Sequence, residues 1–411
     1  MGAARALLAV LAFALPAAAD GESRLGSLIR WYLREESPAR RQDLLEAIEK
    51  LAGGDPRPVA EAIRNGEHFE HGDRPALRKG GKPPVFDLRR PRTAPMEECA
   101  GDLAELVLPE GYSPSRAHPL LIELAPLGLP VPEGTVLLRV RLHAHPQAGE
   151  SAEVAELLVM SLLSHVVELV HVDPRRVFLV AGERDEAALA WCIALHNPDR
   201  FAGVLAGPGG WKEGMPLACN AALFSGLAIV SHKGDRSHEA FLDELQRWNA
   251  RHRRLEATGD PAQNRLLLAP AIDRWRQECV RPAAPSRIRI ADDRGMPVRA
   301  YWLRLAPRVP SLKHEPVGRA WAQRVLAQDA TLEAEFSAKD RIDVKAERVA
   351  AFDLYLDPAL LEPGSVVRVS VNGQVPEARV FRGDIGALLD DYRERRDADL
   401  LYFARLTFTA R

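Results

Sequence analysis

The segment Arg176–Trp191 constrains the fold of this chain more than any other stretch of it. It reads RVFLVAGERDEAALAW, in which a wholly apolar run, Val177–Val180, is followed by glycine, four consecutive charged residues and an alanine-rich stretch. A short run that is apolar at every position is typical of a strand covered on both faces of a parallel sheet. The segment therefore predicts a strand, a sharp turn and a helix in an α/β protein.

The turn in this segment has the spacing of the G-x-S-x-G motif, which places a serine nucleophile between small residues at a strained strand-to-helix turn. In that register the five positions are Gly182, Glu183, Arg184, Asp185 and Glu186. An arginine therefore stands at the nucleophile position, and its guanidinium, which stays protonated in proteins, cannot attack a carbonyl carbon. A register shifted by one residue would offer the neighbouring aspartate as a carboxylate nucleophile. That register takes the glycine out of the turn and is the weaker interpretation.

Strands and helices are predicted to alternate on both sides of this turn. The predicted strands are Leu103–Leu108, Pro119–Leu124, Val136–Leu142, Val177–Val180, Phe201–Ala206 and Leu227–Ser231. The predicted helices are Glu153–Val170, Ala187–His196, Glu239–Arg251 and Leu266–Cys279. This alternation predicts a mostly parallel sheet with helices on both faces.

Several phrases of this region resemble a known family in their order along the chain. They are LPEGYSPSRAHPLLIEL, HVDPRRVFLVAG, ALAWCIALHNPDRFAGVLAGPGGW and LAIVSHKGDRS. Together they resemble the secreted bacterial esterase and prolyl-oligopeptidase-like branch of the α/β-hydrolases. The chain keeps Trp191 and Asp199–Ala202 of that pattern. The resemblance implies an α/β-hydrolase sheet, with a serine nucleophile, a histidine base, an acid and an oxyanion hole in the working enzymes.

At each of the other catalytic stations, this sequence departs from the pattern of the family it resembles. The oxyanion strand ends at Leu124 and continues Ala-Pro-Leu-Gly in place of H-G-G, and Pro126 has no amide hydrogen to donate. Ser237 stands where the acid is expected, which leaves Asp235 as a displaced candidate. The segment expected to hold the base, Arg254–Arg265, contains no histidine. We therefore expect a degenerate site with no catalytic residue.

Two histidine clusters and one basic run have simpler interpretations than a binding site. The clusters are His143 with His145, and His68 and His71 with Glu67 and Glu70. Neither cluster has a third ligand at a suitable spacing, so we expect surface histidines, no metal site and no cofactor. The basic run Arg251–Arg254, with His252 inside it, is interpreted as the solvated end of a helix, where cations complement the helix dipole.

The cysteines do not define a framework from the sequence alone. They are Cys99, Cys192, Cys219 and Cys279. Full pairing would allow three connectivities, which the sequence does not separate. Their wide spacing is not that of a zinc site. Cys192, which follows Trp191, is expected to be a buried apolar residue.

The N-terminus has the features of a secretory signal peptide. Arg5 precedes an apolar run, Ala6–Leu15, and Pro16 and small residues follow it, so cleavage is expected before Asp20. A lone membrane anchor is the alternative, but the run is shorter than the ~20 residues that a span requires. We expect a secreted or periplasmic protein with no membrane span after the signal is removed.

The 411 residues exceed one compact domain, and the texture of the chain changes along it. We expect a signal peptide at residues 1–19, a helical module at 20–75, an α/β-hydrolase-like domain at 76–282 and a β-rich C-terminal domain at 283–411. A linker at Gly72–Pro95 follows the module. In the β-rich domain, Asn372-Gly373 predicts a hairpin turn, and Tyr301 and Trp302 are expected in the core. A helix is predicted at Ile385–Arg395.

Charge and site together favour one function over two others. The formal net charge of −2 implies no nucleic-acid partner. The favoured function is a secreted non-catalytic homologue of α/β-hydrolases that binds an unknown small molecule or a protein. An esterase or peptidase of the serine-hydrolase type with an unrecognised site is the alternative, and a structural envelope protein is the weakest of the three.

Overall fold

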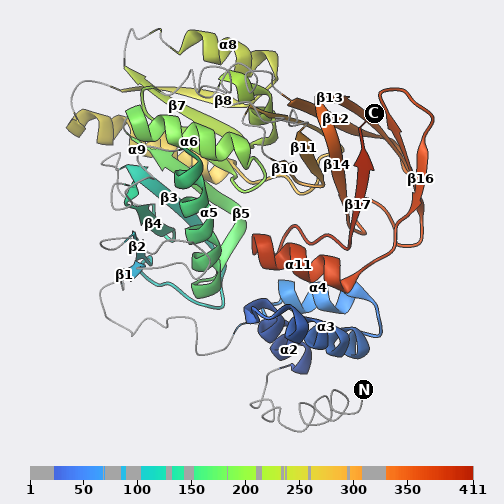
Figure 1. The fold of residues 1–411 in the computed structure, drawn as a ribbon. Coiled ribbons are helices and arrows are strands. Elements are labelled where there is room, and N and C mark those ends of the chain that lie inside the picture. The colour runs from blue at the N-terminus through green and yellow to red at the C-terminus, as the bar shows by residue number, and fades with distance from the viewer. Residues whose placement is uncertain are drawn as a thin grey trace, which may run out of the picture. The chain divides into compact units, whose positions relative to one another are not determined.

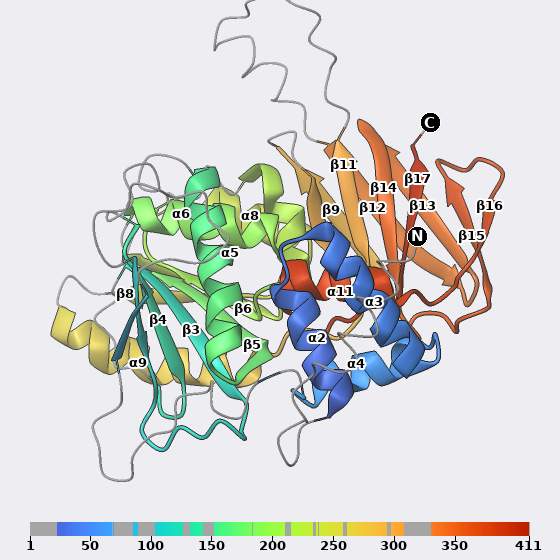
Figure 2. The same ribbon diagram turned by 60° about the horizontal axis from the view of Figure 1, so that its bottom comes forward.

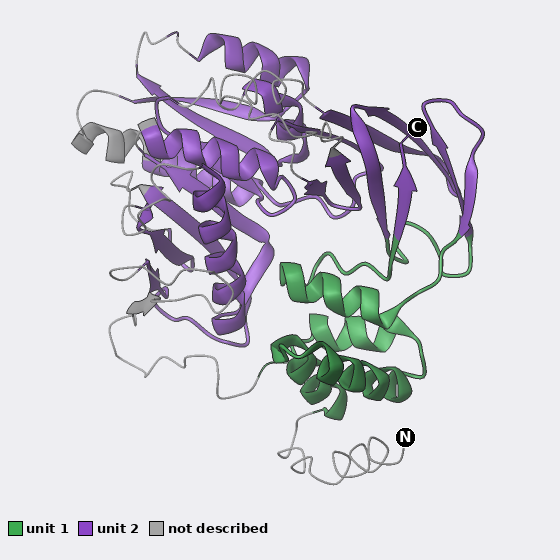
Figure 3. Cartoon of the chain, in the orientation of Figure 1, with its two compact units in different colours: residues 1–74, 356–365, 380–405 green, residues 75–355, 366–379, 406–411 purple. Residues whose placement is uncertain are grey.

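The computed structural model describes residues 23–67, 69, 85–88, 103–125, 132–142, 152–182, 184–209, 215–232, 236, 238–257, 261–293, 297–307 and 330–410. Contacts divide the chain into two compact units (Figure 3). Unit 1 comprises Met1–Arg74, Leu356–Ser365 and Val380–Arg405, and unit 2 comprises Pro75–Tyr355, Val366–Arg379 and Leu406–Arg411. Among the described residues, no helix is both long and apolar enough to cross a membrane. The predicted signal peptide lies outside them.

Unit 2 is built on an eight-stranded sheet with the order β1-β2-β4-β3-β5-β6-β7-β8 (Figure 1). Its strands are β1 (Val85–Leu88), β2 (Ala104–Val107), β3 (His118–Ala125), β4 (Val136–Val140), β5 (Val172–Ala181), β6 (Gly203–Ala206), β7 (Gly226–His232) and β8 (His252–Ala257). The second strand runs antiparallel to both of its neighbours, and the strands from β4 to β8 are parallel. This order and these directions are those of the α/β-hydrolase sheet, so the predicted fold class is confirmed.

Helices cover both faces of this sheet, as Figures 1 and 2 show. They are α5 (Ala152–Leu169), α6 (Arg184–His196), α8 (Glu239–Arg247) and α9 (Pro261–Glu278). Along β5, Val177 and Leu179 belong to the core cluster that includes α5, α6 and α8. The alternate residues, Phe178 and Val180, belong to the cluster that includes α9. The run is apolar at every position because each face of this strand is buried against a helix layer.

The last strand of the sheet corrects two predictions. The helix predicted to extend to Arg251 ends at Arg247, and β8 begins at His252 and pairs in parallel with β7. The basic run is therefore the start of an edge strand and not the end of a helix. Leu255 and Ala257 are buried while Arg254 and Glu256 face solvent, which is the two-residue period of a strand. Charged residues suit an edge because they discourage pairing with another chain.

The predicted linker also contains a strand. Within Gly72–Pro95, β1 pairs antiparallel with β2, and Val85 lies opposite Val107. The strand has the sequence Val-Phe-Asp-Leu. Proline, glycine and basic residues flank it and dominate the composition of the predicted linker. A strand of this length is stabilised by its neighbour, so composition alone does not reveal it.

The C-terminal part is rich in β-structure, as predicted. Its strands are β9 (Arg287–Asp292), β10 (Val298–Ala300), β11 (Leu303–Pro307), β12 (Ala330–Ala338), β13 (Arg341–Glu347), β14 (Val349–Leu356), β15 (Val366–Val371), β16 (Glu377–Val380) and β17 (Ala404–Thr409). They form a sheet with the order β16-β15-β13-β12-β9 and another with the order β10-β11-β14-β17. After β15, Asn372 and Gly373 have φ angles of 51° and 75°, as the predicted hairpin turn requires. Tyr301 and Trp302 are fully buried, which confirms that they are core residues.

Polar contacts tie the β-rich strands of unit 2 to its large sheet. Asn220, in the 3-10 helix η2 (Met215–Leu223), donates to the carbonyls of Leu195 and Ala291 and accepts from the Ala291 amide. Its side chain therefore pairs with β9 as a neighbouring backbone would. Asp199 accepts a hydrogen bond of 2.6 Å from the Tyr301 amide. The retained segment that begins at Asp199 thus has a structural role.

Unit 1 combines the N-terminal helices with a helix from the last part of the chain. The predicted N-terminal helices are α2 (Arg24–Arg34), α3 (Pro38–Ala52) and α4 (Pro56–Arg64), and α11 (Ile385–Arg395) packs with them. The Tyr32 hydroxyl donates to Asp390 at 2.7 Å, and Leu388 and Leu389 are fully buried. The sequence assigned the whole of residues 283–411 to one β-rich domain, whereas contacts assign α11 to the helical unit. An amphipathic pattern shows which face of a helix is buried but not which partner covers it.

We predict that Leu389→Ala destabilises the whole helical unit. Truncating a fully buried leucine costs about 2–5 kcal/mol, whereas the same change at Leu51, which is 46% exposed on α3, should stay within about 0.5 kcal/mol. Hydrogen exchange followed by mass spectrometry measures the effect, and protection should fall in α2 and α4 as well as in α11. Faster exchange confined to α11 would show that this helix is independent of the N-terminal helices.

Candidate functional site

A strand and a helix lie on either side of the predicted turn. The central strand β5 ends at Ala181, and α6 begins at Arg184. Arg184 is therefore the first helical residue after the turn, which is where the motif would mount its serine. Glu183 and the side chain of Arg184 lie outside the described residues.

Two glycines, Gly182 and Gly207, pack backbone against backbone beside this turn. A Cβ atom added to Gly207, just after β6, would lie 2.2 Å from the carbonyl oxygen of Gly182. The amide of Gly207 donates to the carbonyl of Ala181 at 2.8 Å, which continues the pairing of β5 with β6. The contact requires a glycine at position 207, because any side chain there would meet the backbone at the end of β5.

The acidic residues after the tip have a local explanation. Asp185 and Glu186 lie in the first turn of α6, with the aspartate exposed and the glutamate half-buried. Carboxylates are favourable there because the amide groups at a helix N-terminus carry partial positive charge. These side chains therefore stabilise the start of α6.

The remaining catalytic stations are only partly within the described residues. Pro126, Asp235 and Ser237 lie outside them. His252 opens β8, at the end of the strand opposite to the elbow edge. Since β8 has six residues and a strand rises about 3.3 Å per residue, His252 lies about 16 Å from that edge. The residues that connect β8 to α9 are Thr-Gly-Asp and contain no histidine.

One histidine near this edge was not considered from the sequence. His238 follows the loop after β7, stands at the N-cap position of α8 and is fully buried. Its side chain makes no capping hydrogen bond to the helix. In the sequence, the only indication of a role for His238 is that it follows a predicted strand. Burial of a polar side chain depends on the packing around it, which the sequence alone does not show.

The described cysteines are free thiols. They are Cys192, Cys219 and Cys279. Burial raises the pKa of Cys219 to about 11, although Arg289 acts in the opposite direction. Burial, followed by the charge of Glu278, raises the pKa of Cys279 to about 11. Because the thiolate is the reactive form, both thiols are poor nucleophiles at neutral pH. Cys192 is half-buried, and Cys99 lies outside the described residues.

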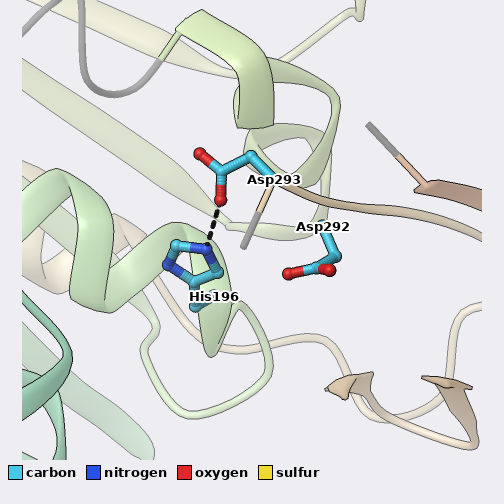
Figure 4. Close-up of side chains that lie close together, drawn as sticks. All are labelled: His196, Asp292 and Asp293. Carbon is cyan, nitrogen blue, oxygen red and sulfur yellow. Dashed lines mark hydrogen bonds and ion pairs between the residues drawn. The ribbon is translucent and has the colours of Figure 1, made fainter. Parts of the chain in front are cut away.

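A second cluster of ionisable side chains lies at the other end of α6. Figure 4 shows His196, the last residue of that helix, beside Asp292 and Asp293. One ligand atom of each lies within 4.8 Å of the others. His196 Nε2 is 3.0 Å from Asp293 Oδ1. The expected histidine clusters at His143 and His145, and at His68 and His71, lie outside the described residues. The sequence did not suggest this one because its members are 97 residues apart.

Comparisons with known proteins find likeness only to solved structures. No protein-family model matches the chain, and no curated protein matches it. A thermostable esterase is 13% identical over 49% of this chain and 64% of its own, with a TM-score of 0.36. S-formylglutathione hydrolase from Staphylococcus aureus is 14% identical over 49% of this chain and 99% of its own, with a TM-score of 0.36. Porphyromonas gingivalis dipeptidyl peptidase 4 is 15% identical over 43% of this chain and 33% of its own, with a TM-score of 0.34. The chain thus spans only part of the esterase and the peptidase.

We predict that Gly207→Ala destabilises unit 2 by about 3 kcal/mol, at the upper end of the range for overpacking, because the added methyl group meets backbone and not a movable side chain. Gly111→Ala is the matched control. Its φ of 70° strains an alanine by about 1–2 kcal/mol, but no atom stands within 4 Å of the new methyl group. Denaturant unfolding measures both. A loss at Gly207 no larger than that at Gly111 would contradict the close contact.

We also predict that iodoacetamide at pH 8 leaves Cys219 and Cys279 unmodified in the native protein. With a pKa near 11, only about 0.1% of each is thiolate at that pH, and burial limits access further. Both should react after denaturation, and native reactivity should rise as the pH approaches 11. Mass spectrometry of tryptic peptides measures the labelling. Native labelling at the rate of a free thiol would contradict the burial of these residues.

Proposed function

We propose that this protein is a non-catalytic homologue of the α/β-hydrolases, which binds a small molecule or another protein. The observation that carries the proposal is the position of Arg184 at the start of α6, directly after the turn that follows β5, where the motif would place its serine. The elbow keeps its backbone and has exchanged its reactive side chain for a cation. A guanidinium offers five fixed hydrogen-bond donors to a ligand and no lone pair for attack.

The residues at the other catalytic positions also argue against hydrolysis. Pro126 removes an amide from the strand end where an oxyanion would be stabilised, and one such donor contributes roughly 3–4 kcal/mol to a transition state. The connection after β8 supplies no histidine to act as a base. Because triad residues act as a unit, these losses are not repaired by one surviving group such as Asp235.

We also propose that the protein is exported. The support is the sequence of Met1–Ala19 alone, with its basic residue, apolar run and small residues before Asp20. Export places the proposed binding function in the periplasm or outside the cell.

We predict that the wild-type protein neither reacts with a serine-directed fluorophosphonate nor hydrolyses activated esters. Arg184→Ser should not create either reaction, because the new hydroxyl has no histidine base after β8 to accept its proton. Fluorescent labelling on a gel and p-nitrophenyl ester turnover measure the two activities on the full chain.

Arg184→Ala is the matched control, since it removes the guanidinium without adding a hydroxyl. A catalytically competent serine hydrolase at the same concentration shows that the reagents work. Ester turnover well above the buffer rate that is abolished by one substitution in the elbow or in the loop after β7 would overturn the proposal. That result would support the alternative, an esterase or peptidase with an unrecognised site.

A further inference from the structure

We propose that His196, Asp292 and Asp293 bind one divalent cation of the first transition row, such as Mn²⁺ or Zn²⁺. The three side chains come from the end of α6, the end of β9 and the residue after it (Figure 4). His196 and Asp292 are buried, and the Asp293 side chain is 24% exposed. The site therefore has a fixed interior and one side open to water.

The hydrogen bonds of His196 prepare one ring nitrogen for a cation. Nδ1 lies 2.7 Å from the backbone carbonyl of Cys192, and because a carbonyl only accepts, Nδ1 carries the proton. In the neutral ring, Nε2 then presents a lone pair toward the Asp293 carboxylate at 3.0 Å. Two lone pairs at that distance repel each other unless a positive charge stands between or beside them. Metal-binding histidines have this arrangement, in which the other ring nitrogen donates to a backbone carbonyl or a carboxylate.

The spacing of the donor atoms fits one ion. Two ligands at right angles, each about 2.1 Å from a metal, are about 3.0 Å apart, and two opposite ligands are about 4.2 Å apart. The observed separation of 3.0 Å between Nε2 and Asp293 Oδ1 matches the first of these distances. One ligand atom of each of the three side chains lies within 4.8 Å of the others. Small rotations of the carboxylates would therefore bring an oxygen of Asp292 to the same ion.

The donor set selects the class of cation. Imidazole suits zinc, iron, copper and nickel, and carboxylates suit manganese as well as magnesium and calcium. One imidazole with two carboxylates therefore favours a first-row divalent ion with water in the remaining positions. Glu156 strengthens the negative potential, because its Oε2 lies 3.8 Å from His196 Nδ1 while Asn197 holds its other oxygen at 2.8 Å.

A bound cation would join two parts of unit 2. His196 ends a helix of the large sheet, and Asp292 ends the first strand of the β-rich region. The Asn220 contacts to Leu195 and Ala291 already bring these segments together. The ion would therefore act as a structural link at this junction, with no part in hydrolysis.

The test uses the full-length protein, stripped with EDTA and dialysed. Isothermal titration with Mn²⁺ and Zn²⁺, followed by elemental analysis after gel filtration, should find one ion per chain. Asp293→Asn should weaken binding at least 10-fold, while its amide nitrogen can donate a hydrogen bond to His196 Nε2 and so keep the two side chains in contact. Asp243→Asn, at an exposed carboxylate on α8, is the matched control and should bind like the wild type.

The outcomes separate the ion from the simpler alternative, a doubly protonated His196 paired with Asp293. With the ion, the thermal midpoint rises on addition of Mn²⁺ in the wild type and in Asp243→Asn but not in Asp293→Asn. If Asp293→Asn does not fold, anomalous diffraction from manganese-soaked wild-type crystals decides, because the peak must lie between the three side chains. No bound ion in the wild type, equal binding in Asp293→Asn, or a peak elsewhere would overturn the proposal.

Discussion

The burial of β5 on both faces is the constraint on which the rest of unit 2 depends. Its residues point alternately into the core of α5, α6 and α8 and into the core of α9. The close contact of Gly182 with Gly207 then fixes the end of this strand against β6. None of these interactions involves the side chain at position 184. The packing that forms this strand, turn and helix therefore does not depend on which side chain stands at position 184, because packing and catalysis make separate demands on the sequence.

Two residues of the pattern that the sequence resembles have clear roles in packing. Trp191 is fully buried and packs edge-on against Phe241 of α8, with ring centroids 5.1 Å apart. Asp199 holds the backbone of Tyr301, where the chain turns between β10 and β11. Both residues are needed by the core, and both are retained.

Sequence reasoning predicted what short-range patterns encode and missed what distant contacts decide. The apolar run at β5 and the helical periodicity of α5 and α11 are local, and these elements lie where they were expected. The sequence predicts a helix end where the edge strand β8 lies. The basic run Arg251–Arg254 has no apolar residue, so the alternation of apolar and polar residues begins only at Leu255 and Ala257. The assignment of α11 to the N-terminal helices could not be read from the sequence, since its buried face fits any apolar partner. The sequence also does not reveal the cluster at His196, because its members come together only when β9 packs beside η2 and α6.

The two candidate sites stand at opposite ends of one helix, and this distance decides how they relate. Arg184 begins α6 and His196 ends it, so the rise of 1.5 Å per residue separates their backbones by about 18 Å. A metal ion polarises or activates only the groups that it coordinates, at a distance of about 2 Å. A cation at His196 therefore could not generate a nucleophile at the elbow or stabilise an oxyanion there. The absence of hydrolysis and the presence of a structural ion are independent propositions, and the failure of one leaves the other intact.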